Sequence, residues 1–133
     1  MLLSIVMMVK NEEKYLDKTL FALNDLRSEI DSELIVLDTG STDNTVEIAK
    51  KYTDKIYFTK WNNNFADMRN ISISYASGEW ILILDADEKL TNYDKLKKFF
   101  NSKNCNKYNS ATIEIKSFFD EDEKRYNEQN RIV

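Results

Sequence analysis

Two aspartates separated by one small residue, Asp85-Ala86-Asp87, directly follow the apolar segment Trp80–Leu84. Alternate side chains of an extended chain point the same way, so both carboxylates are expected to face one side. Such a pair offers oxygen ligands to a hard divalent cation, which can bridge the phosphates of a nucleotide. Since the chain has no histidine and a single cysteine, magnesium or manganese is the ion that the ligands favour. An acidic turn that caps the next helix is the structural alternative.

A further acid, Asp38, follows the apolar segment Glu33–Leu37 and begins the run Asp-Thr-Gly-Ser. Its carboxylate can accept a hydrogen bond from the ring N–H of a pyrimidine, and the glycine permits a sharp turn beside a ligand. Capping of the following helix by Ser41, Thr42 or Asp43 is the structural alternative. Capping accounts for those residues but leaves Asp38 unexplained.

Two other motif families compete for these acids. Asp-Thr-Gly-Ser is also the signature of aspartic proteases, which include small chains that donate one aspartate to a homodimer. Those proteases are glycine-rich β-structures, whereas Asp38 lies between two segments of helical periodicity in a chain with 2 glycines. Phosphotransfer domains with a D-x-D-x-T motif need threonine or valine where Lys89 stands. The surroundings exclude both families.

One arginine, Arg69, lies within Phe65–Tyr75, a segment with the apolar spacing of a helix. A guanidinium there can reach a phosphate or a base, and a solvated helix face explains it equally well. The aromatic residues Trp61, Phe65 and Trp80 are expected to pack in the core rather than stack on a ligand. Aromatic side chains at helix or strand spacing are usually core residues.

The elements that must position these residues alternate along the chain. Strands are expected at Leu2–Val9, Glu33–Leu37, Lys55–Thr59, Trp80–Leu84 and Ser110–Ser117. The last of these alternates apolar and polar residues, so it should expose one face to solvent and be an edge or antiparallel strand. Helices are expected over about Glu12–Leu26, Val46–Tyr52, Phe65–Tyr75 with Gly78 as left-handed C-cap, and Leu96–Phe100. A loop is expected at Asp120–Lys124 and the start of a strand at Arg131–Val133.

This alternation predicts an α/β fold with a doubly wound, mostly parallel sheet flanked by helices. Ligands of such sheets bind beyond the carboxyl ends of the strands. Asn11, Asp38 and the Asp85/Asp87 pair each follow a predicted strand, so they should converge on one edge of the sheet.

Length and composition set the class of protein. A chain of 133 residues with 42% hydrophobic and 32% charged residues suits one globular domain, and the net charge of -4 gives no reason to expect nucleic acid. The absence of proline argues against an all-β chain. Cys105 can form no internal disulfide, so a reducing, cytoplasmic location is expected. The apolar start ends at Lys10, short of a membrane span.

Four ordered segments together resemble the family 2 glycosyltransferases of GT-A fold, most closely a bacterial branch with the run D-T-G-S-T-D-N-T. The segments are Ser4–Glu13, Leu37–Thr45, Trp61–Asn70 and Leu84–Glu88. The resemblance implies an inverting, hexosyltransferase-type transfer from a nucleotide diphosphate sugar, usually a UDP-sugar, assisted by Mn²⁺ or Mg²⁺. The acceptor would be a glycan, a lipid or a peptide.

The resemblance also implies a role for individual residues. Asp38 would bind the base, Arg69 would lie beside the nucleotide, and Asp85 would face ribose or phosphate. The implied nucleotide-sugar site is Val9, Asn11, Glu12, Asp38, Ser41, Arg69, Asp85 and Ala86, with Asp87 and Asp85 as metal ligands.

The family's general base lies in an acceptor-binding region well after the D-x-D motif, and few residues follow Asp87 here. Residues 1–133 are therefore expected to form a single nucleotide-sugar-binding domain without the acceptor-binding C-terminal part, and the general base is unassigned. A nucleotide-binding or interaction module without transfer activity is the alternative function. An open sheet edge is expected to permit a homodimer.

Overall fold

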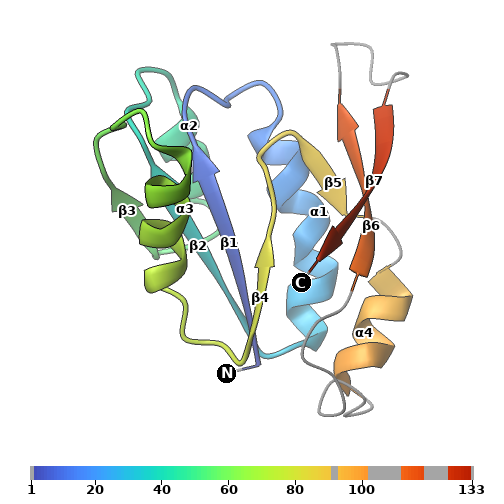
Figure 1. Ribbon diagram of the computed structural model, residues 1–133. Helices are drawn as coiled ribbons and strands as arrows, with labels where there is room; N and C mark the ends of the chain where they lie inside the picture. The colour runs from blue at the N-terminus through green and yellow to red at the C-terminus, as the bar shows by residue number, and fades with distance from the viewer. Residues whose placement is uncertain (1, 91–92, 102–111, 119–125, 133) are drawn as a thin grey trace.

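The computed structural model describes residues 2–90, 93–101, 112–118 and 126–132. Its elements are β1 (Leu3–Val9), α1 (Leu16–Glu29), β2 (Ser32–Asp38), α2 (Thr45–Ala49), β3 (Ile56–Phe58), α3 (Phe65–Ser74), β4 (Trp80–Ile83), β5 (Glu88–Leu90), α4 (Tyr93–Asn101), β6 (Thr112–Phe118) and β7 (Tyr126–Ile132) (Figure 1). Strand and helix alternate as far as β4. This confirms the predicted α/β fold with a mostly parallel sheet.

The main sheet has the strand order β3-β2-β1-β4, and all of its neighbouring strands are parallel. The central strands β1 and β2 are buried almost throughout, as their continuous apolar sequences require. Val9 at the end of β1 pairs with Asp38 at the end of β2, and Asp38 pairs with Phe58 at the end of β3. The carboxyl ends of the strands therefore meet along one edge, at the top in Figure 1.

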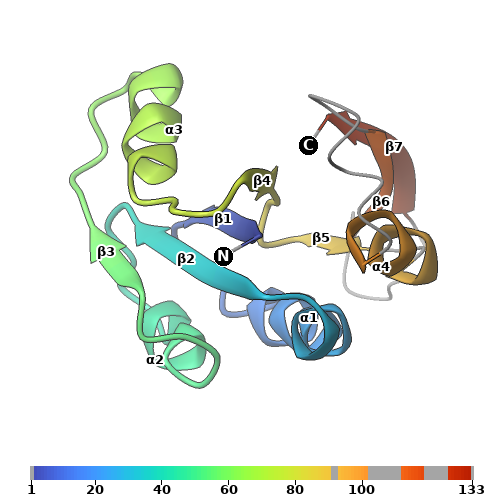
Figure 2. The same cartoon turned by 90° about the horizontal axis from the view of Figure 1, so that it is seen from below.

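Helices cover both faces of this sheet. Figure 2 shows α1 and α2 on one face and α3 on the other. The leucine stripe of α1, including Leu20 and Leu23, packs in one buried cluster with alternate β1 residues such as Ile5 and Met7. No helix among the described residues has the length and apolar composition needed to cross a membrane.

A second, antiparallel sheet has the strand order β5-β6-β7. The antiparallel expectation for β6 is confirmed, but β6 is the middle strand of this sheet rather than an edge. Strand β5 is absent from the sequence prediction, and β7 begins at Tyr126, well before the predicted Arg131. Cys105 and Asp120–Lys124 lie outside the described residues.

Gly78 does not have the role expected of it. Helix α3 ends at Ser74 with Tyr75 as its C-cap, and Gly78 is not in the left-handed region. A Cβ atom on Gly78 would lie 2.7 Å from the backbone nitrogen of Ser4. Glycine is therefore required because the chain passes against the backbone of β1 before it enters β4.

Candidate functional site

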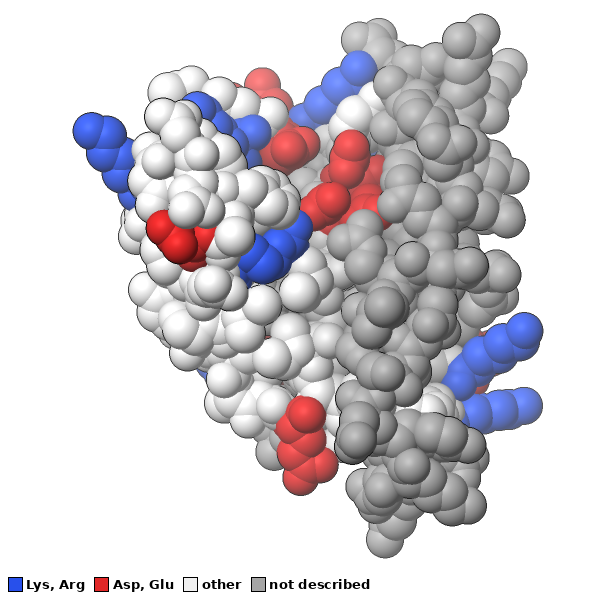
Figure 3. All heavy atoms as spheres, in the orientation of Figure 1, with Lys and Arg blue, Asp and Glu red and all other residues white. Residues whose placement is uncertain are grey.

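A pocket with a volume of about 320 Å³ opens at the carboxyl edge of the main sheet. Figure 3 shows acidic side chains gathered in a hollow at this upper end of the molecule. The lining comes from the end of β1, the segments after β1, β2, β3 and β4, and the start of α3. The lining residues are Met8, Val9, Lys10, Glu12, Thr39, Trp61, Phe65, Asp85, Ala86 and Asp87.

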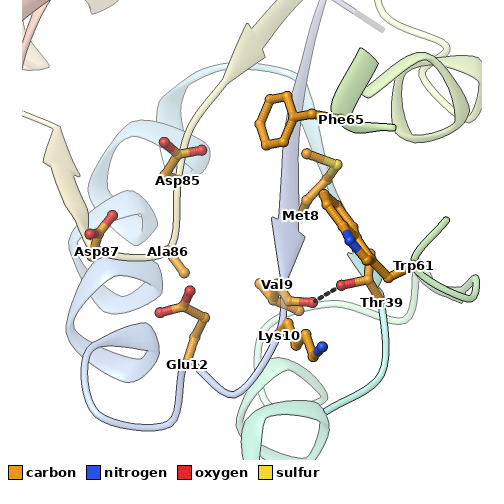
Figure 4. A pocket seen from close by; sticks show the side chains of 10 residues that line it. All are labelled: Met8, Val9, Lys10, Glu12, Thr39, Trp61, Phe65, Asp85, Ala86 and Asp87. Carbon is orange, nitrogen blue, oxygen red and sulfur yellow. Dashed lines mark hydrogen bonds between the residues drawn. The ribbon is translucent and has the colours of Figure 1, made fainter. Parts of the chain in front are cut away.

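One side of the pocket is acidic. Figure 4 shows Glu12, Asp85 and Asp87 together on this side. Burial, and then the negative charges of Asp87, Asp85 and Asp43, raise the pKa of Glu12 to about 7. The pocket thus concentrates negative potential, which favours a cation and opposes a bare anion.

The acidic side supplies oxygen ligands only. Within the described residues, no group of three or more His, Cys, Asp or Glu side chains is clustered closely enough to hold a metal ion by itself. Mg²⁺ in proteins is commonly held by one or two carboxylates and completes its shell with water and substrate phosphates. Asp85 and Asp87 fit that donor set, in which the ligand contributes part of the coordination.

The loop that carries these aspartates is held from both sides. Thr19 of α1 donates from Oγ1 to the carbonyl of Ala86, at 2.5 Å. Asp85 donates its backbone N–H to Glu88 Oε1 at 2.8 Å, and the Glu88 side chain is buried. Neither support was predicted from the sequence, although Thr19 is a polar residue at a buried position in the leucine stripe of α1.

The loops after β1 and β2 bind each other. Asn11 donates its backbone N–H to Ser41 Oγ at 2.9 Å and accepts at Oδ1 from the Thr42 N–H at 2.8 Å. Asn11 is left-handed, with φ 53°, and the next N–H, of Glu12, bonds Thr45 Oγ1 at 2.8 Å. Neither Asn11 nor Ser41 lines the pocket, so their bonds fix the loop from which Glu12 reaches it.

Asp38 is buried, and its two carboxylate oxygens differ. Oδ2 accepts from the N–H groups of Gly40 and Ser41, at 3.1 and 3.0 Å, and closes the turn in which Gly40 has φ 124°. Oδ1 is buried and finds no hydrogen-bond partner in the described part of the chain. Asp43, one of the residues expected to cap α2, accepts at Oδ1 from the Thr45 N–H at 2.9 Å, but the N-cap of α2 is Asn44, whose side chain makes no capping hydrogen bond.

Arg69 of α3 turns toward the acidic side. Its Nη2 lies 3.7 Å from Asp85 Oδ1, and its side chain is 17% exposed, which excludes the solvated helix face. Its Nη1 is buried and finds no hydrogen-bond partner among the described residues. A guanidinium N–H is thus left for an acceptor near Asp85.

The aromatic residues divide into two groups. Trp80 is 8% exposed and packs in the core, as predicted. Trp61 and Phe65 are 36% and 57% exposed and line the pocket, so the prediction that they pack in the core is wrong. Periodicity alone does not separate an apolar stripe on the core from one on a pocket.

The structure brings most of the expected site residues to this edge. Val9, Glu12, Asp85, Ala86 and Asp87 line the pocket. Asp38 lies next to the lining residue Thr39 in the chain, and Arg69 pairs with Asp85. The lining residues that sequence analysis did not assign to the site are Met8, Lys10, Thr39, Trp61 and Phe65.

The fold is an α/β fold, and its pocket lies beyond the carboxyl ends of the parallel strands, where sheets of this kind bind their ligands. The family model for glycosyl transferase family 2 matches residues 4–132. The chain therefore belongs to this family, as the four motifs predicted.

A curated relative, an uncharacterized glycosyltransferase of Haemophilus influenzae, is 41% identical over 106 residues, which are 75% of this chain and 41% of the relative. Among solved structures, S. aureus TarS 1-349 in complex with UDP-GlcNAc has a TM-score of 0.62 at 27% identity. The match covers 84% of this chain and 33% of the TarS chain. Glucosyl-3-phosphoglycerate synthase from Mycobacterium tuberculosis, in complex with Mn²⁺, UDP and glucosyl-3-phosphoglycerate, has a TM-score of 0.56 at 25% identity.

That synthase match covers 65% of this chain and 34% of the synthase. The chain thus spans about a third of these solved structures and less than half of the curated relatives that it matches. These structures are of the GT-A type that the sequence predicted.

Proposed function

We propose that this chain binds a nucleotide diphosphate sugar, a UDP-sugar, together with Mg²⁺ or Mn²⁺ in the pocket at the carboxyl edge of the sheet. It would serve an inverting transfer of the sugar to a glycan, lipid or peptide acceptor. The observation that carries the proposal is the meeting of Glu12, Asp85 and Asp87 in one pocket. UDP complexes of similar structures, one of them with Mn²⁺, support it.

The charge of the pocket makes a cation necessary for this ligand. A diphosphate and the carboxylates of Asp85 and Asp87 are all negative and would repel one another in a half-enclosed site. When bound, the metal ion would neutralise charge on the departing diphosphate, which is the electrostatic part of the catalysis. Asp87 and Asp85 would hold it.

The remaining residues would bind and orient the nucleotide. Arg69 can donate its unpartnered N–H to a phosphate beside Asp85. The unpartnered Oδ1 of Asp38 suits the ring N–H of a pyrimidine. Val9 and Ala86 line the pocket and give it shape, while Asn11 and Ser41 hold the loops in place.

Isothermal titration with UDP and UDP-GlcNAc, with and without Mn²⁺, tests the proposal. The expected result is binding that requires the metal in the wild type and is lost in Asp87→Ala. Asp54→Ala is a matched control, because Asp54 is an exposed aspartate just before β3, at the opposite edge of the sheet. It should bind like the wild type.

Binding without any metal dependence, or equal binding by Asp87→Ala, would contradict the proposal. A hydrolysis assay with UDP-GlcNAc then separates transfer from binding. Release of free sugar supports a transferase site, whereas metal-dependent binding without release favours a binding module.

A further inference from the structure

Trp61 and Phe65 form an aromatic wall on the side of the pocket that faces away from the acids (Figure 4). They are among the most exposed large hydrophobic side chains of the described residues, at 36% and 57%. Leaving such area in water costs free energy, roughly 25 cal/mol per Å² of apolar surface. A pocket that keeps two aromatic side chains exposed is suited to a flat, partly apolar ligand group.

The turn before α3 fixes the indole of Trp61. Its Nε1 donates to Asn63 Oδ1 at 3.1 Å, and Asn63 has φ 64°, a left-handed conformation that asparagine tolerates. Asn64 accepts at Oδ1 from the Asp67 N–H at 3.1 Å and caps α3. The single N–H of the indole is therefore already used, and what Trp61 offers a ligand is its ring.

Phe65 supports this ring from α3. The two rings meet edge to face, with centroids 6.3 Å apart and an angle of 67° between their planes. Arg69 in turn lies over Phe65, with Cζ 5.0 Å from the ring centroid. The wall is thus part of a packed series of contacts that reaches Asp85 through Arg69.

The strand register places the wall near Asp38. Asp38 pairs with Phe58, and the carbonyl of Asp38 accepts from the Thr59 N–H at 3.0 Å. Trp61 follows two residues after Thr59, and Thr39, directly after Asp38, lines the same pocket as Trp61. A planar group against Trp61 therefore lies on the side of the pocket lined by Thr39, the residue that follows Asp38 in the chain.

We propose that Trp61, supported by Phe65, is the surface on which the pyrimidine ring of the nucleotide stacks. This proposal rests on the proposed function, because it assumes that the diphosphate lies at the acidic side of the pocket. With the phosphates there, the base is the flat group left for the opposite side. Stacking on an aromatic residue is worth roughly 1–3 kcal/mol per base.

The test compares UDP with inorganic pyrophosphate, which carries the same diphosphate group without a base. Both are titrated in the presence of Mg²⁺ into the wild type, Trp61→Ala and Trp61→Phe. Trp61→Ala should weaken UDP binding about 5- to 150-fold and leave pyrophosphate binding unchanged. Trp61→Phe should keep most of the UDP affinity, since it retains a ring.

Tryptophan fluorescence gives a second readout, because Trp80 is the only other tryptophan and lies in the core. UDP should quench the emission of the wild type, pyrophosphate should not, and the quenching by UDP should vanish in Trp61→Phe. Phe21→Ala is the matched control, since Phe21 is 68% exposed on α1 and does not line the pocket. It should bind both ligands normally.

The outcomes separate the two proposals. If the wild type and Trp61→Ala bind UDP equally well, the stacking proposal is overturned and the proposed function stands. An equal loss of UDP and pyrophosphate binding in Trp61→Ala also overturns it, because the effect would then not depend on the base. A wild type that binds neither ligand with Mg²⁺ overturns the proposed function, and the stacking proposal with it.

Discussion

The hydroxyl of Thr19 donates a 2.5 Å hydrogen bond to the carbonyl of Ala86, which lies 67 residues further along the chain. Ala86 separates Asp85 from Asp87, so α1 holds the backbone between the two acids of the pocket. The N–H of Asp85 is held in turn by the buried Glu88. The direction of both carboxylates therefore depends on the packing of α1 against the sheet.

Replacement of Thr19 by valine should weaken metal-dependent UDP binding several-fold. Valine has nearly the shape of threonine but leaves the buried carbonyl of Ala86 without its donor, at a cost of about 1–3 kcal/mol. The loop can recover this free energy by moving toward water, and that movement displaces Asp85 and Asp87. Calorimetric titration of UDP with Mn²⁺ measures the effect, and Thr19→Ser should bind nearly as the wild type does.

The matched control is Thr53→Val. Thr53 Oγ1 donates to the carbonyl of Leu34 at 2.6 Å, just before β3 and away from the pocket. This variant should lose stability in a similar way and keep its UDP affinity. Equal weakening of UDP binding in both variants would show that general destabilisation, rather than the position of the acidic loop, is responsible.

Glu12→Gln should stabilise the metal-free protein at pH 8 and change it little at pH 4.5. Burial and the charges of Asp87, Asp85 and Asp43 raise the pKa of Glu12 to about 7 in the folded state, from 4.5. The folded state thus binds the proton more tightly, and this contribution to stability, complete below pH 4.5, is lost as pH rises through 7. Glutamine stays neutral and avoids the loss.

Urea unfolding in the presence of EDTA at both pH values measures this difference. Glu47→Gln serves as control, because Glu47 is an exposed residue of α2 that pairs only at the surface with Lys50. A stabilisation of Glu12→Gln that is the same at pH 4.5 and pH 8 would contradict the raised pKa.

The central strands of the main sheet were predictable because β1 and β2 are apolar runs that the sheet buries. The strand β5 was not predictable, because its three residues are too few to show an alternation of apolar and polar side chains. Its first residue, Glu88, also uses its side chain to bind the backbone of the acidic loop. Helix α1 begins at Leu16 rather than near Glu12, and the residues between form a turn in which the Glu12 carbonyl accepts from the N–H groups of Tyr15 and Leu16.

The acids at the carboxyl edge of the sheet were predictable for a different reason. Parallel strands carry whatever follows them to one edge, so the positions of Asp38 and Asp85 in the chain were enough. The aromatic wall was not predictable, because Phe65 has the same spacing whether α3 turns it to the core or to a pocket. The support of Thr19 depends on a contact across 67 residues, which no local pattern encodes.

Gly78→Ala should destabilise the protein by about 1–3 kcal/mol, as overpacking commonly does. The new Cβ would lie 2.7 Å from Ser4 N and 2.8 Å from the carbonyl carbon of Leu3, so the backbone of β1 or of the turn must shift. Urea unfolding at pH 7 measures the loss. Ser4→Ala should not rescue it, because the clash is mainly with backbone atoms, and rescue would contradict this account.

Glu33→Gln should cost about 2–4 kcal/mol at pH 7, because several polar groups converge on this buried carboxylate. Oε1 accepts from Ser4 Oγ at 2.5 Å and from the N–H of Ser77 at 2.7 Å, and Oε2 pairs with Lys55. These bonds join β1, β2 and the turn before β4, so their loss should destabilise the whole sheet.

The pH dependence of this loss is a stringent test. Burial works to raise the pKa of Glu33, but the bonds from Lys55, Ser4 and Ser77 prevail and lower it to about 2. The stabilisation is therefore complete above pH 4.5 and is lost as pH falls toward 2, so the gap between wild type and Glu33→Gln should narrow from pH 7 to pH 3. Urea unfolding across this range measures the gap. A gap that stays constant would mean that the charge of Glu33 contributes nothing.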